Sequence, residues 1–212
     1  MSRRSYTHYP RTILWLVPGG AMPADLPAVH SGGPDRAGVA PFYLSKWPIT
    51  NEQLEAFDPD YRRSPLSPGD RDSAIGVTFE KAEEYCRWYA EVSRKPIRLP
   101  TEREWEYACR GGSATAYFWG NDAAGADRHA WHAGNSEGRA HAADAKVANS
   151  FGLHGMAGGV WEWTVGADGP VLRGGSFRTP ADELRSDLRR PAAPDLRADD
   201  VGFRVVKPFR SG

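Results

Sequence analysis

Residues 149–164 read Asn149-Ser-Phe-Gly152-Leu153-His154-Gly155-Met156-Ala-Gly158-Gly159-Val160-Trp161-Glu162-Trp163-Thr164. The glycines of this stretch can take positive φ angles, which lets carbonyl groups converge without interference from a Cβ atom. The indoles of Trp161 and Trp163 can each bury a large apolar area. This mixture disfavours a regular helix or strand and predicts a tightly wound loop with aromatic anchors. Carbonyls turned inward beside Glu162 would also suit a hard cation.

Further motifs lie on both sides of this stretch. They are Pro41-Phe-Tyr-Leu-Ser-Lys-Trp-Pro-Ile-Thr-Asn51, Ile97-Arg-Leu-Pro-Thr-Glu-Arg-Glu-Trp-Glu-Tyr-Ala108, Tyr117-Phe-Trp-Gly120, Val171-Leu-Arg-Gly-Gly-Ser-Phe177 and Val201-Gly-Phe-Arg-Val-Val206. In this order the motifs closely resemble the formylglycine-generating enzyme family, also called the sulfatase-modifying-factor domain. The resemblance implies an α+β fold, a single compact domain with little regular secondary structure that is a variant of the C-type lectin fold. We expect this domain at residues 13–210, after a loose N-terminal arm at residues 1–12.

The overall composition excludes several classes of partner. The chain has 212 residues, and its 27 basic and 27 acidic side chains balance, so no global field favours nucleic acid or an anionic membrane. The early apolar run from Ile13 to Val17 is too short for a signal-peptide core or a membrane span. We therefore expect a cytoplasmic protein whose partner is a protein, a peptide or a small-molecule ligand.

Local signals predict a few regular elements. Apolar runs predict strands at Ile13–Val17, Phe42–Leu44, Val171–Arg173 and Gly202–Val206. Capping-box spacing predicts helices that begin after Thr50 and Thr101, and helical periodicity predicts a longer helix from Thr78 to about Ser93. Cys86 and Cys109 fall on the inner faces of the two later helices. Core packing therefore explains both cysteines better than a redox role, which needs an exposed thiol with a lowered pKa.

The resemblance implies copper chemistry that this chain departs from. In the family's oxidases, two cysteines after the Gly-Gly-Ser-aromatic motif bind copper, which activates dioxygen to convert a substrate cysteine to formylglycine. Alignment on Gly174-Gly175-Ser176-Phe177 places Thr179 and Leu184 at the positions of these cysteines. Neither side chain supplies the thiolate that Cu(I) selects. We therefore do not expect a copper-dependent formylglycine-generating oxidase.

The resemblance also implies structural calcium, for which the ligand set is incomplete. The candidate calcium ligands are Asn135, Glu137, Gly158, Val160 and Glu162. Gly155 stands where the family has an acidic or amide side chain, and Gly159 replaces the usual asparagine. Since Ca²⁺ takes six to eight oxygens, water would have to complete the shell. In the alternative, Asn135 and Glu162 simply accept hydrogen bonds from loop N–H groups.

Two further groups of polar residues have both a chemical and a structural interpretation. His129, His132 and His141 could hold iron or copper, although histidines in surface loops more often have no such role; iron is not excluded. Ser176 and Trp161 match positions that line the oxidases' active site. Ser176 lacks the second glycine of a nucleophile elbow, and a hydrogen-bonding turn serine is the simpler interpretation.

Arginine and carboxylate side chains alternate between Phe177 and Arg204. Many of them could pair with one another and only hold a long loop in shape, but loops on a rigid scaffold commonly carry function. This pattern also resembles the variable proteins of diversity-generating retroelements, which display binding residues on the same scaffold. The candidate ligand-binding residues are Arg178, Thr179, Asp182, Glu183, Arg185 and Arg189.

Two functions follow as hypotheses. The first is a ligand- or protein-binding module without the catalytic cysteines, which uses the arginine- and aspartate-rich loop. The second is an oxidoreductase with different active-site chemistry, similar to the cysteine-less family member that matures the siderophore pyoverdine, which would oxidise a peptide or small molecule with dioxygen. The residues to test for catalysis are then Trp161, Ser176, Glu183 and Arg178.

Overall fold

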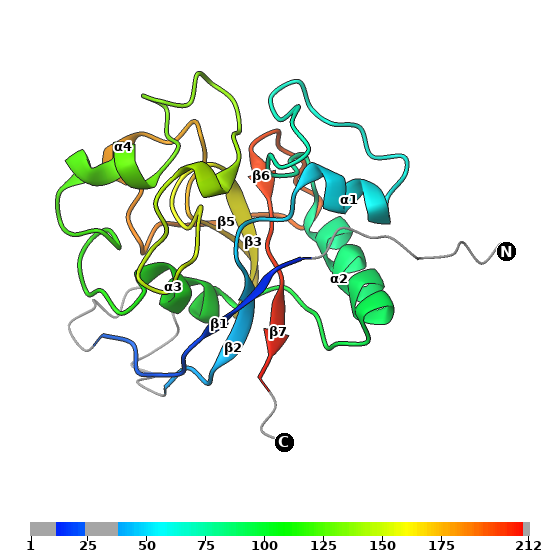
Figure 1. The fold of residues 1–212 in the computed structure, drawn as a ribbon, viewed down its shortest axis with the longest axis horizontal. Coiled ribbons are helices and arrows are strands. Elements are labelled where there is room, and N and C mark those ends of the chain that lie inside the picture. The colour runs from blue at the N-terminus through cyan, green and yellow to red at the C-terminus, as the bar shows by residue number, and fades with distance from the viewer. Residues whose placement is uncertain (1–11, 24–37, 210–212) are drawn as a thin grey trace, which may run out of the picture.

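Two small β-sheets form the centre of the computed structural model, which describes residues 12–23 and 38–209 (Figure 1). The first sheet has the order β1-β2-β7 and is antiparallel. The second has the order β5-β4-β3-β6, in which the β3–β6 pair is parallel. The strands are β1 (Leu14–Val17), β2 (Phe42–Ser45), β3 (Trp161–Gly166), β4 (Gly169–Arg173), β5 (Arg189–Pro191), β6 (Val201–Gly202) and β7 (Val206–Pro208). Of the predicted N-terminal arm, all but Thr12 lies outside the described residues.

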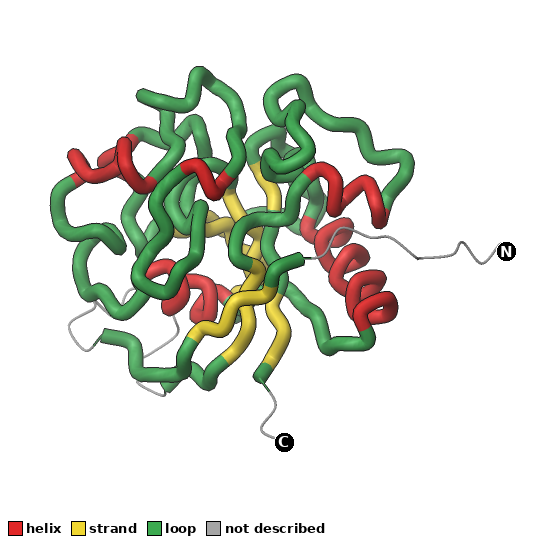
Figure 2. Tube along the Cα trace, in the orientation of Figure 1, coloured by secondary structure: helices red, strands yellow, loops and turns green. Residues whose placement is uncertain are grey.

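Helices flank the strands on both sides in the view of Figure 1, with α1 and α2 to the right and α3 and α4 to the left. They are α1 (Asn51–Phe57), α2 (Phe79–Ser93), α3 (Glu102–Arg110), α4 (Ala126–His129) and the 3₁₀ turns η1 (Ala123–Gly125), η2 (Ala143–Ala145) and η3 (Ala181–Glu183). Figure 2 shows that loops make up most of the upper half of the molecule. Among the described residues, none of the helices has the length and apolar character needed to cross a bilayer.

The predicted helix boundaries are confirmed by their caps. The hydroxyl of Thr78 accepts a hydrogen bond from the Lys81 N–H at 3.2 Å and starts α2. Thr101 and Glu104 form the predicted reciprocal capping box of α3, which satisfies backbone donors that the first turn leaves unpaired. Gly111 ends α3 at φ 57°, a left-handed conformation that glycine adopts without a Cβ clash.

The prediction of a loop for residues 149–164 is confirmed as far as Val160 and is wrong from Trp161 onward. From Trp161 the chain continues as β3, which pairs with β6 on one side and β4 on the other. Every residue from Trp161 to Thr164 is buried. The segment Trp161-Glu162-Trp163-Thr164 does alternate apolar and polar residues as a strand does, but the prediction of a loop gave more weight to the glycines that precede it.

Two predicted strands differ in detail from those observed. The segment Gly202–Val206 is not one strand: the chain leaves β6 after Gly202 and enters β7 at Val206, so that it passes from one sheet to the other. The first predicted strand forms as β1, but it is an edge strand and not a buried one. Trp15 and Leu16 are 41% and 45% exposed.

Two large apolar clusters and two smaller ones make up the core. The first large cluster contains Tyr85 of α2, Trp163 of β3 and Phe203, and the indole N–H of Trp163 donates to the Val77 carbonyl at 2.8 Å. The second large cluster contains Leu44 of β2 and Trp105 of α3. Cys86 belongs to the first cluster and Cys109 to the second, and both are free thiols. Burial raises the pKa of the Cys109 thiol to about 12, so a core role fits both cysteines.

Candidate functional site

The turn after β4 brings the Gly-Gly-Ser motif against the tryptophan loop, the name used here for residues 154–162. Gly175 has φ 76°, and a Cβ atom there would lie 2.5 Å from Leu184 Cδ2 and 3.3 Å from Thr179 Cβ. The Thr179 hydroxyl accepts the Ser176 N–H at 2.9 Å. The Phe177 N–H donates to the Gly159 carbonyl at 2.8 Å. Glycine is therefore required at 175, and both side chains in the oxidase cysteine positions pack against this one residue.

Thr179 and Leu184 do not provide a copper site. They flank Gly175 together, 7% and 1% exposed. One offers a hydroxyl that is already hydrogen-bonded and the other a hydrocarbon, whereas Cu(I) selects soft thiolate or thioether ligands. The position that alignment assigned to copper is therefore a packed apolar contact in this chain.

The candidate catalytic residues are not assembled as a reactive centre. The fully buried Ser176 donates its hydroxyl to Asp200 Oδ2 at 2.8 Å and accepts the Arg178 N–H at 3.2 Å. A carboxylate can hold a serine in place, but among the described residues no imidazole of the kind that activates a nucleophile is bonded to this hydroxyl. Trp161 is 7% exposed and lies under the guanidinium of Arg190, 4.8 Å from the ring centre. Glu183, in contrast, is exposed at the end of η3.

Most of the candidate ligand-binding residues have partners within the protein. Arg178 pairs with Asp199, Arg185 with Asp187, and Arg189 with Glu102. The hydrogen bond from Arg178 holds the pKa of the Asp199 carboxyl below its usual value. Two of these pairs lie within the loop, as the structural interpretation of the sequence predicted, whereas Arg189 joins the loop to α3.

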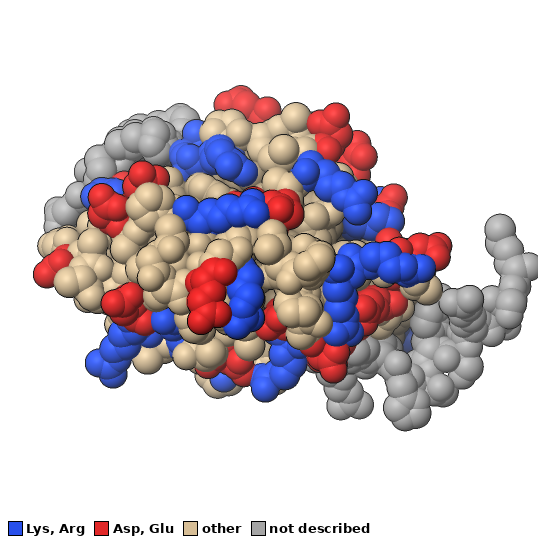
Figure 3. Space-filling model, turned by 90° about the horizontal axis from the view of Figure 1, so that it is seen from above, with Lys and Arg blue, Asp and Glu red and all other residues tan. Residues whose placement is uncertain are grey.

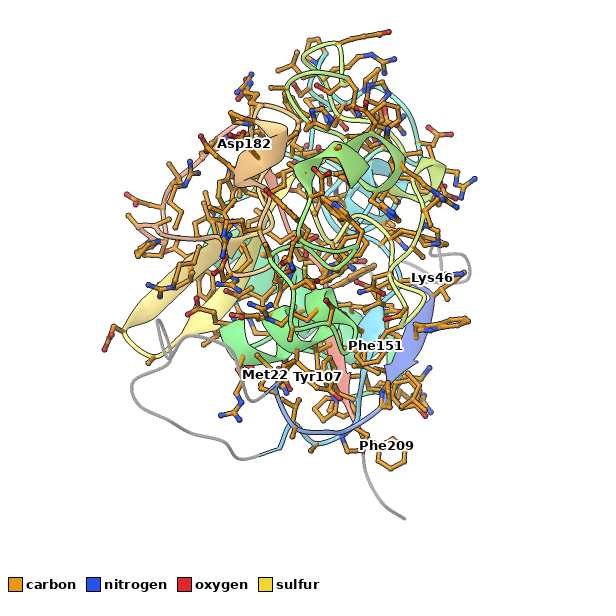
Figure 4. All side chains as sticks on the ribbon, turned by 90° about the vertical axis from the view of Figure 1, so that its left-hand side faces the viewer. Met22, Lys46, Tyr107, Phe151, Asp182 and Phe209 are labelled. Atoms are coloured by element: carbon orange, nitrogen blue, oxygen red, sulfur yellow. The ribbon has the colours of Figure 1, made fainter. Side chains whose placement is uncertain are left out.

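Two carboxylates of the loop remain exposed on η3. Asp182 and Glu183 point away from the core, and the Asp182 carbonyl accepts the Tyr117 hydroxyl at 2.7 Å. In Figure 4, Asp182 lies at the opposite end of the molecule from Phe209, which follows β7. On the face seen in Figure 3, acidic and basic side chains are interspersed without a continuous patch of either sign. This mixture agrees with the balanced charge of the sequence.

Two of the predicted calcium ligands, Glu162 and Asn135, have other partners for their side chains. Both carboxylate oxygens of Glu162 bind Arg204, Oε1 to Nη2 at 2.7 Å and Oε2 to Nε at 2.5 Å. The Trp105 indole N–H also donates to Oε2, at 2.7 Å. Asn135 Oδ1 accepts the His132 N–H at 2.9 Å, which is the loop-capping role given as the alternative. Glu137 was predicted to ligate through its backbone carbonyl; its side chain is exposed and lies 3.6 Å from Arg139.

The three histidines of the middle region each have a separate environment. His132 Nε2 lies 2.9 Å from Asp127 Oδ1, and its Nδ1 accepts the Gly134 N–H. The ring of His129 stacks on Trp119 and that of His141 on Trp131. In the part of the chain that the structure describes, no group of three or more His, Cys, Asp or Glu side chains could hold a metal ion. In the structure these histidines contact aromatic rings or hydrogen-bond within turns.

A small cavity lies beside the tryptophan loop, between its glycines and the Trp131–His141 stack. Its volume is about 10 Å³, which is room for about one water molecule. Its described lining includes Gly158, Val160 and Lys146, the last of which places its ammonium 4.0 Å from the Trp131 ring centre.

Three residues of the site were missed by the sequence reasoning. They are Arg204, Asp200 and Arg190. Arg204 left a signal, since it is a charged residue inside the apolar run from Val201 to Val206, and a buried charge needs a buried partner. Asp200 and Arg190 left no signal that separates them from the other charged residues of the loop.

The chain is similar in sequence to known proteins. The chain matches the family described as "Sulfatase-modifying factor enzyme 1-like domain" over residues 2–209. It is 33% identical over 171 residues to the inactive C-alpha-formylglycine-generating enzyme 2 of Mus musculus, covering 68% of this chain and 54% of that protein. It is 32% identical over 185 residues to the formylglycine-generating enzyme of Streptomyces coelicolor, covering 70% and 56%. The chain thus spans about half the length of these curated relatives.

Two solved structures have the same fold. Treponema denticola variable protein 1 superposes with a TM-score of 0.80 at 20% identity, covering 92% of this chain and 95% of that one. PvdO from Pseudomonas aeruginosa superposes with a TM-score of 0.76 at 23% identity, covering 92% and 94%. The expected variant of the C-type lectin fold is thereby confirmed.

Proposed function

The chain belongs to the sulfatase-modifying factor enzyme 1-like domain family, and from this premise we propose that it is a member without copper chemistry that binds a ligand or a protein partner. The binding face is the exposed side of the loop Phe177–Asp200 together with the adjacent tryptophan loop. Fold alone does not assign this function, because one fold hosts many functions. The proposal therefore depends on the site.

One observation carries the proposal. The two side chains at the oxidase cysteine positions, Thr179 and Leu184, pack on Gly175 and are almost fully buried. Ser176 beside them is 0% exposed and hydrogen-bonded to Asp200. A reactive centre needs a nucleophile or metal that substrate can reach, so a site closed in this way favours recognition at the surface above it.

The surface above the closed site suits recognition. Its side chains form ion pairs within the loop, and a loop that is ordered before binding leaves less entropy for a partner to overcome. Among the ion pairs of the described residues none includes Arg190, whose guanidinium lies on the nearly buried Trp161. An arginine held in this way keeps its planar set of N–H donors available for a carboxylate or phosphate. Asp182 and Glu183 offer acceptors on the same loop.

The relatives are compatible with this proposal. One curated relative is named as inactive, while another is named as the active enzyme, and this chain covers about half of each. The two solved structures are less than 25% identical and show the fold. We further propose a cytoplasmic protein whose partner is a protein, a peptide or a small molecule.

The test begins with a peptide ligand selected from a displayed random library on the purified wild-type protein. If the loop is the binding face, the variants Arg190→Ala and Glu183→Ala should bind the selected peptide about tenfold or more weaker. The matched control is Arg71→Ala, which removes an exposed ion pair with Asp144 outside the loop. Equal loss of affinity in the control, or none in the loop variants, would contradict the proposed face.

Experiments on the same purified protein distinguish binding from the alternative function, that of an oxidoreductase that oxidises a peptide or small molecule with dioxygen. Metal analysis and oxygen consumption with candidate peptides supply the readout. Bound iron or copper with turnover that is lost in Ser176→Ala would favour the enzyme. A protein without redox metal and without oxygen uptake, which still binds the selected peptide, supports the binding module.

A further inference from the structure

A second cavity, with a volume of about 160 Å³, lies at the end of the first sheet. Phe209, which lines it, lies at the opposite end of the molecule from Asp182 of the proposed binding face (Figure 4). We propose that this cavity binds a small aromatic carboxylate, a molecule with one flat ring and one negative charge. This inference is independent of the binding function proposed above. The cavity is called here the lysine–aromatic pocket, and it is lined by Tyr43, Lys95, Pro96, Lys207, Pro208 and Phe209.

The pocket lies where the loop after α2 and the end of β7 stop pairing with each other. Arg98 and Val206 exchange two backbone hydrogen bonds, of 3.0 and 2.8 Å, in an antiparallel bridge. Two residues further along are Pro96 on one segment and Pro208 on the other, and proline has no N–H to donate. Among the described residues, no backbone hydrogen bond joins the two segments beyond the bridge. The ladder ends there, and both prolines line the pocket.

Two aromatic rings form one wall of the pocket. Tyr43 of β2 lies directly opposite Lys207 of β7, so their side chains stand on the same face of the sheet. The rings of Tyr43 and Phe209 stack, with centroids 6.0 Å apart and 25° between their planes. Phe209 is 42% exposed. A flat ligand ring placed against this wall would therefore remove apolar surface from water on both partners.

Two ammonium groups give the pocket a positive charge. Lys207 Nζ lies 3.8 Å from the centre of the Tyr43 ring, and this cation–π contact holds the ammonium while leaving it N–H donors for a ligand. Lys95 follows the C-cap of α2 and is exposed.

This positive charge has no counter-charge within the pocket. Neither Asp nor Glu occurs among the described lining residues. Among the ion pairs of the described residues, none includes Lys95 or Lys207. A ligand carboxylate would supply the missing negative charge, and the complementary charges would favour an acid over a neutral molecule of the same shape.

The size of the pocket limits the class of ligand. An apolar cavity of about 150 Å³ binds one benzene molecule, whereas pockets for drug-sized ligands measure about 300–1,000 Å³. The volume of about 160 Å³ thus matches a single six-membered ring and is too small for a nucleotide. An anion without a ring, such as acetate or inorganic phosphate, would leave the aromatic wall uncovered. The ring and the charge together therefore define the ligand.

Benzoate tests the inference on the intact protein. Titrations followed by saturation-transfer difference NMR should give a dissociation constant of about 1 mM, which is reasonable for so small a ligand. Benzamide has the same shape without the charge, and acetate has the charge without the ring. Each should bind about fivefold or more weaker than benzoate. No binding of benzoate, or binding of benzamide or acetate as tight as that of benzoate, would overturn the inference.

Variants of the pocket locate the binding. Lys207→Met removes a charge and Phe209→Ala removes part of the aromatic wall, so each should weaken benzoate binding about fivefold or more. The matched control is Lys46→Met, because the Lys46 ammonium also lies over an aromatic ring, 4.6 Å from the centre of the Trp15 ring, but outside the pocket. Equal loss in the control, or no loss in the two pocket variants, would overturn the inference.

A last variant separates the pocket from the proposed binding face. Glu183→Ala, which should weaken the selected peptide, should leave the affinity for benzoate unchanged. Loss of benzoate binding in Glu183→Ala would place the acid on the other face and overturn the inference. If Lys207→Met fails to fold, Phe209→Ala and the comparison of benzoate with benzamide still decide.

Discussion

At the scale of single residues, the buried charges of this protein differ from its surface charges in what they contribute. Arg173 and Arg204 are both 0% exposed, and each has carboxylate partners, Glu102 and Glu106 for the first and Glu162 for the second. Exposed pairs such as Arg178–Asp199 contribute about 0–1 kcal/mol. Breaking a buried pair by removing one partner is far more destabilising, because the other charge stays buried and unpaired.

This difference gives a prediction for the Glu162–Arg204 pair. Arg204→Met should lower the free energy of unfolding by about 3–5 kcal/mol. The double variant Glu162→Met with Arg204→Met should be less destabilised than the sum of the single variants, since it leaves no unpaired charge. Denaturant unfolding of the four proteins forms a double-mutant cycle. Additive losses would mean that the two side chains do not act as a pair.

The same scale explains which site residues the sequence could reveal. Thr179 and Leu184 were located by alignment alone, because the Gly-Gly-Ser-aromatic motif fixes their distance along the chain. The partner of Glu162 lies 42 positions away, and the hydrogen bond from Ser176 to Asp200 spans 24. Spacing in sequence does not encode such contacts, because they depend on how the two sheets pack.

At the scale of elements, the sequence predicted α1, α2, α3 and the strands β2 and β4, but not α4 or β3. Caps at Thr78 and Thr101 are local: the residues that satisfy the first turn are within three positions of one another, so they can be recognised before the fold is known. The strand β3 depends instead on β4 and β6, which arrive later in the chain. Its glycine-rich approach looks like a loop until both neighbours are in place.

The cap of α3 gives a pH-dependent prediction. Burial raises the pKa of the Glu104 carboxyl, but hydrogen bonds from Arg98 and Thr101 together lower it by more than that. The pKa of Glu104 is therefore lower than its ordinary value of 4.5. A carboxyl whose pKa is lower in the folded state contributes stability above its unfolded pKa, and this contribution is lost as the pH falls through the folded value. Glu104→Gln should therefore be less stable than wild type at neutral pH.

The stability difference between Glu104→Gln and wild type should shrink as the pH falls below about 4.5. Urea unfolding at a series of pH values measures it. The control is Glu52→Gln, which changes an exposed carboxylate in the first turn of α1. A Glu104 difference that stays constant with pH would indicate that side-chain shape, and not charge, makes the cap.

At the scale of the whole molecule, the scaffold and the chemistry are separable. The segment Phe203–Val205 carries the chain from the second sheet to the first, and the turn of Gly174–Thr179 is anchored by Phe177, which is buried against Ile75, Ala140 and Val160. The same architecture superposes on Treponema denticola variable protein 1 and on PvdO, at 20% and 23% identity. Because the same fold forms in proteins that share about a fifth of their residues with this chain, the particular side chains of the site do not define the fold.

This separation predicts that copper binding can be introduced without refolding the chain. A Cβ atom added at Gly175 would lie 3.3 Å from Thr179 Cβ and 2.5 Å from Leu184 Cδ2, so both side chains approach the same place. Cysteine is no larger than leucine. The double variant Thr179→Cys with Leu184→Cys should bind about one equivalent of Cu(I), because paired thiolates are the ligands this ion selects. Each single variant, with one sulfur, should bind it far more weakly. Competition with a chromophoric Cu(I) chelator measures the affinities, and circular dichroism checks that the fold is retained. If the folded double variant held Cu(I) no better than either single variant, positions 179 and 184 would not be geometrically equivalent to the cysteine pair of the oxidases. The alignment of these two positions would then be wrong.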